Sequence, residues 1–150
     1  MIGMTMISFN NVTTESEWNR AFCKSLIDEC GADIFACVAS ERQTPGFPDR
    51  YISHPLFSGW VECKRSGNSL SKLQERICKR LNQHQPGTAW VLWLNDDLPL
   101  HPESLQWFDP GGNVWRSVIV EQCNRPIELL KQLNHYQRRE RIRNHGANVR

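Results

Sequence analysis

The chain has 150 residues, of which 39% are hydrophobic and 23% charged, and a formal net charge of +2 at pH 7. This length is enough for one domain with a sizeable core, and neither an internal repeat nor a low-complexity segment is present. No apolar run reaches 18 residues and the opening residues lack a basic segment, so we expect neither a membrane span nor a secretory signal.

The first half of the chain predicts one helix followed by three strands. Thr13 or Thr14 caps a helix that runs to about residue 29, and Gly31 ends it. Residues 34–40 form a strand anchored by Phe35 and Val38, and a turn rich in Pro and Gly follows. Residues 50–53 and 60–64 are then expected to pair as a hairpin around a reversal at 54–59.

The second half predicts two more helices and two more strands. Apolar residues at positions 70, 73, 77 and 81 indicate a helix over residues 70–81. A strand at 88–94 and a polar loop at 95–102 follow, then a turn at 110–112, a strand at 114–120 and a helix at 127–136.

The strand Trp60-Val61-Glu62-Cys63-Lys64 carries the most informative pattern. Successive side chains of a strand point to opposite faces, so Glu62 and Lys64 share one face while Val61 and Cys63 share the other. A lone Glu-x-Lys is usually an ion pair on a solvated face. Here the hairpin also brings Asp49 close to Glu62, so that two carboxylates could share one hard cation.

These residues resemble the VRR-NUC family, a branch of the PD-(D/E)xK nuclease superfamily. The matching features are the turn Gly46-Phe47-Pro48-Asp49, the strand Gly59-Trp60-Val61-Glu62-Cys63-Lys64, the helix that carries Gln74 and the strand at 88–94. The resemblance covers roughly residues 14 to 96. It implies an α/β fold with a restriction-endonuclease-like three-layer core, in which helices flank a central mixed β-sheet, and it implies a metal-dependent DNA nuclease.

The resemblance also implies the roles of individual residues. Asp49 and Glu62 would be metal ligands together with the backbone carbonyl of Cys63, Lys64 would be the catalytic lysine, and Gln74 would face the site from its helix. Lys64 could position or deprotonate the attacking water, or pair with phosphate oxygens.

The family places a glutamate of the first helix in the metal site, and both Glu15 and Glu17 are candidates. Acids in a first helical turn are also favoured by the helix dipole alone. Carboxylate ligands select a hard ion, so the expected cofactor is Mg²⁺ or Mn²⁺. RecB-type exonucleases carry a Tyr where this chain has Cys78, which argues against a processive exonuclease.

Six cysteines lie in segments expected to form the core, and none belongs to a CxxC pair. We therefore expect reduced thiols rather than disulfides or a structural zinc site.

Basic residues concentrate near the C-terminus. Residues 138–150 hold five Arg against one Glu, so we expect a nuclease domain at 1–137 and a basic tail at 138–150 that could follow DNA phosphates or serve only as a solubilising tail. A second basic set lies on or beside the helix at 70–81. The residues expected to contact DNA are Arg65, Lys72, Arg76, Lys79, Arg138, Arg139, Arg141 and Arg143.

The sequence and its resemblance together predict a Mg²⁺- or Mn²⁺-dependent DNA endonuclease, a homodimer that cuts branched DNA such as a Holliday junction or a flap. The expected location is the cytoplasm, of a bacterial cell or of a virus-infected host, with neither a membrane partner nor a small-molecule cofactor. Two alternatives stay open. One is a non-catalytic DNA-binding protein with a nuclease fold, and the other is a restriction-type or general duplex or single-strand nuclease.

Overall fold

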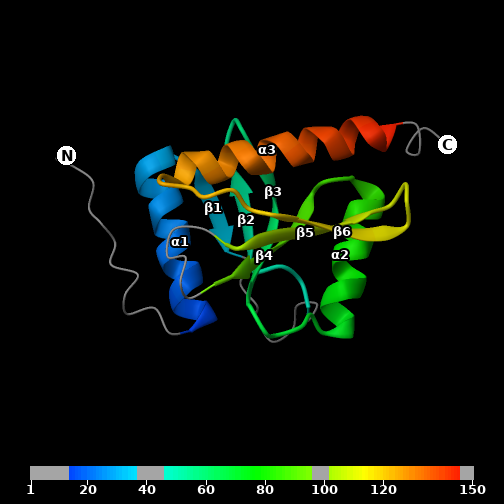
Figure 1. Ribbon diagram of the computed structural model, residues 1–150, viewed down its shortest axis with the longest axis horizontal. Helices are drawn as coiled ribbons and strands as arrows, with labels where there is room; N and C mark the ends of the chain where they lie inside the picture. Colours follow the sequence, from blue (N-terminus) through cyan, green and yellow to red (C-terminus); the bar gives the residue numbers. More distant parts are fainter. Residues whose placement is uncertain (1–13, 37–45, 96–101, 146–150) are drawn as a thin grey trace.

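A computed structural model describes residues 14–36, 46–95 and 102–145 of the chain. Within them, six strands form one sheet, and three helices lie against its two faces (Figure 1). In chain order these elements are α1 (Glu15–Cys30), β1 (Asp33–Ala36), β2 (Arg50–Ser53), β3 (Ser58–Arg65), α2 (Lys72–His84), β4 (Ala89–Leu94), β5 (Ser104–Asp109), β6 (Val114–Ile119) and α3 (Pro126–Arg143).

The six strands follow one another across the sheet in chain order, from β1 to β6. Each neighbouring pair is antiparallel except β3 and β4, which run parallel. A parallel pair cannot be closed by a tight turn, and here α2 makes the crossover between the two strands. The sheet is therefore mixed, as predicted, with the β2–β3 hairpin on one side of the crossover and the β5–β6 hairpin on the other.

Alternation along β3 assigns the two faces of the sheet. Val61 and Cys63 are 1% and 3% exposed and belong to the main core, which α1 and α3 complete with residues such as Leu26 and Leu129. The opposite face lies against α2, whose buried Asn82 donates hydrogen bonds to backbone carbonyls of β4 and β5. The architecture is thus α/β, with helices on both faces of a mixed sheet.

Several local predictions are confirmed. The hydroxyl of Thr14 accepts a hydrogen bond from the backbone N–H of Glu17 at 3.1 Å, so Thr14 caps α1. Gly31 ends that helix in the left-handed conformation, with φ of 68°. Strands β2 and β3 form the expected antiparallel hairpin, and the five described cysteines are unpaired.

The first strand differs from its prediction. It was expected at 34–40, whereas β1 spans Asp33–Ala36 and residues 37–40 lie outside the described part of the chain. Phe35 is 59% exposed, so the prediction that it anchors the core is wrong, and the half-buried Ile34 packs there instead. Val38, the second expected anchor, lies outside the described residues.

Helix α2 begins two residues later and ends three residues later than predicted. Its apolar stripe at positions 70, 73, 77 and 81 is only half-buried, and the fully buried positions are Cys78 and Asn82. Helix α2 therefore packs against the sheet through Cys78 and the polar Asn82, which lie beside the apolar stripe.

Strand β5 was not predicted, and the last helix is longer than predicted. Residues 104–109 pair with β6 through the predicted Pro-Gly-Gly turn, forming a second hairpin. Helix α3 continues to Arg143, so the first six residues of the expected basic tail are helical. In the described part of the chain, no helix combines the length and apolar character needed to cross a membrane.

Candidate active site

A tight turn before β2 places Asp49 beside Glu62. Gly46 has φ of 84°, and a Cβ there would lie 2.9 Å from the Leu73 side chain and 3.1 Å from the backbone nitrogen of Gln74. Only glycine allows the turn to pack this closely on the start of α2. Asp49 then leads directly into β2, where Arg50 pairs with Val61, the residue before Glu62.

Glu62 lies in an environment that resists ionisation. It is 6% exposed. The pKa of Glu62 is raised to about 8, mainly by burial and then by the negative charge of Asp49, while Lys64 partly opposes the shift. A hydrogen bond with Asp49 and the charge of Glu15 also raise this pKa. The Glu62 carboxyl group is therefore protonated near neutral pH, as expected for an acid buried beside another carboxylate.

Lys64 lies two residues beyond Glu62 on the same face of β3, as predicted. Its side chain is half-buried, and its charge lowers the pKa of Glu62. The ammonium group thus acts on the carboxylate pair electrostatically while retaining contact with solvent. This is the position from which a lysine can reach a water molecule or a phosphate oxygen bound between the strands and the solvent.

The structure separates the two glutamates of the first helix. Glu15 Oε1 accepts a hydrogen bond from the Arg65 backbone N–H at 2.6 Å and another from Asn68 Nδ2 at 2.8 Å, which ties the start of α1 to the end of β3. Its charge also raises the pKa of Glu62. Glu15, rather than Glu17, is therefore the acid of the first turn that lies near the Asp49 and Glu62 carboxylates.

A cavity of about 310 Å³ opens beside Glu15 and Asp49. It is lined by the first turns of α1 and by the strands β2 and β3, through Glu15, Ser16, Asn19, Asp49, Arg50 and Cys63. Three of these residues, Ser16, Asn19 and Arg50, had not been singled out from the sequence. Arg50 donates from Nη1 to the Asp49 carbonyl at 3.1 Å, and Asn19, which is 6% exposed, accepts from the thiol of Cys23. In the sequence, Arg50 is indicated only by its position next to Asp49. Asn19 is indicated only as a polar residue on the buried side of an amphipathic helix.

The donor chemistry of this site fits a hard divalent cation. Among the described residues, no group of three or more His, Cys, Asp or Glu side chains is arranged to hold a metal ion. The structure brings together Asp49 and Glu62, with Glu15 close enough to affect their ionisation. Their mutual repulsion favours protonation, and a cation between them would reverse that preference by stabilising both charges.

Gln74 has a structural role at the start of α2. Its side-chain oxygen accepts from the Ser71 backbone N–H at 2.9 Å, and its own backbone N–H donates to the Ser71 hydroxyl at 3.1 Å. This reciprocal pair is a capping box, which stabilises the first turn of the helix. The side chain of Gln74 was expected to face the site, and in the structure its oxygen serves this cap.

The residues expected to contact DNA have different surroundings. Lys72 and Arg76 are exposed on α2, whereas Lys79 lies over the Phe108 ring with its Nζ 5.4 Å from the ring centroid. Lys79 is therefore partly occupied by a cation–π contact within the fold. Arg65 alternates with Lys64 and lies on the α1 face of β3.

The arginines of α3 also divide into two groups. Arg138 and Arg141 are exposed, while Arg143 pairs with Asp109 and with Glu140, at 3.3 Å in each case. Arg139 is exposed and lines a second cavity.

Comparison of the chain with protein-family models, with curated proteins and with solved structures gave no match.

Proposed function

We propose that this protein is a Mg²⁺- or Mn²⁺-dependent DNA endonuclease whose reaction is phosphodiester hydrolysis. The observation that carries the proposal is the carboxylate pair of Asp49 and Glu62, with Lys64 on the same strand face and the pKa of Glu62 raised to about 8. Burying two acidic groups side by side lowers the stability of a fold, and such pairs are typical of catalytic and ligand-binding sites.

Each residue has a definable task in such a reaction. A bound divalent cation supplies charge neutralisation and a more acidic water. Asp49 and Glu62 would hold it, with Glu15 as the nearest further carboxylate and the backbone carbonyl of Cys63 as a further ligand. Lys64 would orient the attacking water, take its proton, or bind a non-bridging phosphate oxygen.

The proposal extends to branched DNA, a homodimer and a restriction-endonuclease-like core. Two nicks placed symmetrically about a junction require two active sites related by a two-fold axis, which a homodimer supplies. The mixed sheet with helices on both faces is compatible with that core. Light scattering of the purified protein tests the dimer, since a monomer mass at cleavage concentrations contradicts it.

The test of the activity is cleavage of four labelled substrates: a four-way junction, a flap, a single strand and a linear duplex. Each is incubated with Mg²⁺, Mn²⁺ or EDTA. We expect metal-dependent cleavage that Glu62→Gln and Lys64→Ala each reduce by about a hundredfold or more. Matched controls are Asp28→Asn and Lys24→Ala, which remove charges of the same kind from an exposed ion pair on α1.

The outcomes separate the alternatives. Cleavage that survives in both Glu62→Gln and Lys64→Ala refutes the assignment of the site. Tight DNA binding without cleavage under any metal would show a non-catalytic DNA-binding protein instead. Equal cutting of duplex and branched substrates would replace structure-specific cleavage with general nuclease activity.

A further inference from the structure

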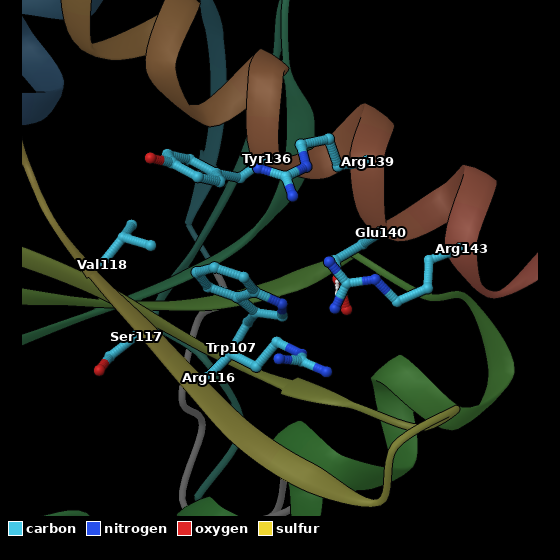
Figure 2. Close-up of a pocket in the computed structure, with 8 residues that line it drawn as sticks. All are labelled: Trp107, Arg116, Ser117, Val118, Tyr136, Arg139, Glu140 and Arg143. Atoms are coloured by element: carbon cyan, nitrogen blue, oxygen red, sulfur yellow. Dashed lines mark ion pairs between the residues drawn. The ribbon is translucent and has the colours of Figure 1, made fainter.

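A second cavity, of about 180 Å³, lies between the C-terminal half of α3 and the β5–β6 hairpin. Figure 2 shows Arg139 and Arg143 reaching from α3 toward the indole of Trp107, with Arg116 approaching the same space from β6. The full lining is Trp107, Arg116, Ser117, Val118, Tyr136, Arg139, Glu140 and Arg143. In Figure 1 this end of α3 lies at the opposite side of the view from α1, which supplies Glu15 to the candidate active site.

Strand register and helix periodicity gather these side chains. Trp107 of β5 pairs directly with Arg116 of β6, so the two side chains lie next to each other on the face that α3 covers. On α3, Tyr136, Arg139 and Arg143 are spaced three and four residues apart, and therefore project from one side of the helix. The cavity thus has an aromatic wall and a cationic rim.

Buried acids hold two of the three arginines. Asp109 is fully buried and accepts from Arg116 Nε at 2.7 Å and from Arg143 Nη1 at 3.3 Å. Glu140 is 1% exposed and lies 3.3 Å from Arg143. These contacts fix the guanidinium groups in place while leaving the side chains of Arg116 and Arg143 40% and 37% exposed.

Arg139 differs from its two neighbours. In the described part of the chain, no carboxylate lies within ion-pair distance of it, and its side chain is exposed at the cavity. The buried Oε2 atom of Glu140 accepts no hydrogen bond from a described residue and has Arg143 Nη1, 3.3 Å away, as its ion-pair partner. Burial raises the pKa of Glu140, and so does the charge of Asp109. The positive charge at the rim is therefore not fully compensated by the fold.

The aromatic wall offers a flat surface beside that charge. The rings of Trp107 and Tyr136 lie with centroids 5.7 Å apart and planes inclined by 35°. Trp107 is buried and Tyr136 is half-buried, so the tyrosine ring is the one that reaches the opening. Guanidinium groups bind phosphate through paired N–H donors, and an adjoining aromatic ring binds a base or sugar by stacking.

We propose that this cavity binds a phosphate group of a nucleotide, with Arg139 as its main ligand, Arg116 and Arg143 as supporting donors, and Tyr136 against the attached base or sugar. The nucleotide would belong to a DNA strand, and that part of the proposal rests on the proposed nuclease function. A purely structural cluster would need Arg116 and Arg143, which pair with the buried acids, but it would not need Arg139.

Arg139→Ala is therefore the discriminating variant, and Lys131→Ala is its control. Both remove one positive charge from an exposed position of the same helix, but only Arg139 lines the cavity. Binding of inorganic phosphate, thymidine 5′-monophosphate and a short single strand is measured by calorimetry in EDTA, in a Glu62→Gln background. The indole ¹H–¹⁵N resonance of Trp107 reports whether a ligand enters the cavity.

We expect the nucleotide to bind more tightly than inorganic phosphate and to shift the Trp107 resonance. Arg139→Ala should weaken nucleotide binding by about tenfold, the usual effect of losing one charge-assisted hydrogen bond, while Lys131→Ala should leave it nearly unchanged. Equal losses in both variants, or an unmoved Trp107 resonance, overturn the site. Equal affinities for nucleotide and inorganic phosphate overturn the stacking contribution of Tyr136.

This test is independent of cleavage because it is made without metal and in a variant of the candidate active site. A Trp107 shift in a protein that cuts no DNA would support the phosphate site and contradict the nuclease. Metal-dependent cutting without the shift would support the nuclease and contradict the phosphate site.

Discussion

Replacing Glu62 by Gln should stabilise the metal-free protein while abolishing its cleavage activity. Raising a carboxyl pKa from 4.5 to about 8 corresponds to about 5 kcal/mol, at 1.36 kcal/mol for each tenfold change in proton affinity. This is the cost of keeping Glu62 ionised in the folded state. Movement of Asp49 and entry of water relieve part of it, so we expect Glu62→Gln to raise the free energy of unfolding by about 1–3 kcal/mol at pH 8.

The pH dependence gives this effect its sign. Below about pH 4 both the folded and the unfolded chain hold the proton of Glu62, so the substitution should change little. As the pH rises toward 8, the unfolded chain loses that proton first, because its pKa is the lower one. The wild type therefore loses stability across this window, and Glu62→Gln should not lose that part.

The assay is urea unfolding in EDTA between pH 5 and 9, for the wild type, Glu62→Gln and Glu75→Gln. Glu75 is exposed on α2 and provides a control for the loss of one carboxylate, with an expected change below about 0.5 kcal/mol. A difference between wild type and Glu62→Gln that does not grow with pH would refute the assigned electrostatics. Adding Mg²⁺ should stabilise only the wild type, increasingly at higher pH.

Three further predictions test the site and the fold. Glu15→Gln should lower metal-dependent cleavage by about 10- to 100-fold, measured as an initial rate, while Glu17→Gln should stay within about twofold of wild type; the reverse order would exchange their roles. Asn82→Ala removes a fully buried amide that donates to two backbone carbonyls and accepts from one backbone N–H, so we expect a loss of about 3 kcal/mol in urea unfolding, and a loss below 1 kcal/mol would contradict it. Asp109→Asn leaves the guanidinium groups of Arg116 and Arg143 without their buried counter-charge, and we expect it to cost about 3 kcal/mol at neutral pH. Hydrogen bonds led by that of Arg116 hold the pKa of Asp109 below its usual range despite burial, so this cost should start to decline as the pH falls below about 4 and continue to decline until the folded protein is protonated at Asp109. A cost that is independent of pH would argue against that pairing.

Local patterns in the sequence predicted what a single segment determines. The alternation along β3 correctly placed Val61 and Cys63 in the core and Glu62 and Lys64 on the opposite face, because the strand period is fixed by the backbone. The pattern said nothing about what would cover that second face. In the fold Glu62 is buried, its charge acts on Cys78 of α2, and burial together with the neighbouring Asp49 raises the pKa of its carboxyl group; no local pattern encodes this environment.

The sequence around strand β5 contains a pattern that predicts a β-hairpin. Leu105 and Trp107 alternate with polar or half-buried neighbours, and the Pro-Gly-Gly turn that follows is flanked by a second β-prone segment. Two such segments around a turn predict a hairpin.

The length of α3 was underestimated because its buried face changes from apolar to polar residues. Leu130 and Leu133 continue at helical spacing into Gln137, Glu140 and Asn144, and all five are buried. Hydrophobic periodicity ends at the leucines, whereas the helical spacing does not. A polar residue on the buried side of a helix is stable only where tertiary contacts satisfy it, so its position becomes interpretable only with the fold.

Those contacts change how the C-terminal arginines should be tested. Removing residues 138–150 would delete Glu140 and Asn144, and the Asn144 side chain accepts from the Gly111 backbone N–H at 2.7 Å, which fastens α3 to the β5–β6 turn. Weakened DNA binding in that truncation would therefore combine lost charge with a damaged hairpin. Arg138→Ala with Arg141→Ala removes two exposed charges and leaves the buried contacts intact. If α3 follows DNA phosphates, this double variant should lower affinity and reduce the slope of log affinity against log salt by about 2, without changing the unfolding midpoint. An unchanged slope would remove the exposed arginines of α3 from the DNA interface, and a lowered midpoint would show that they stabilise the fold instead.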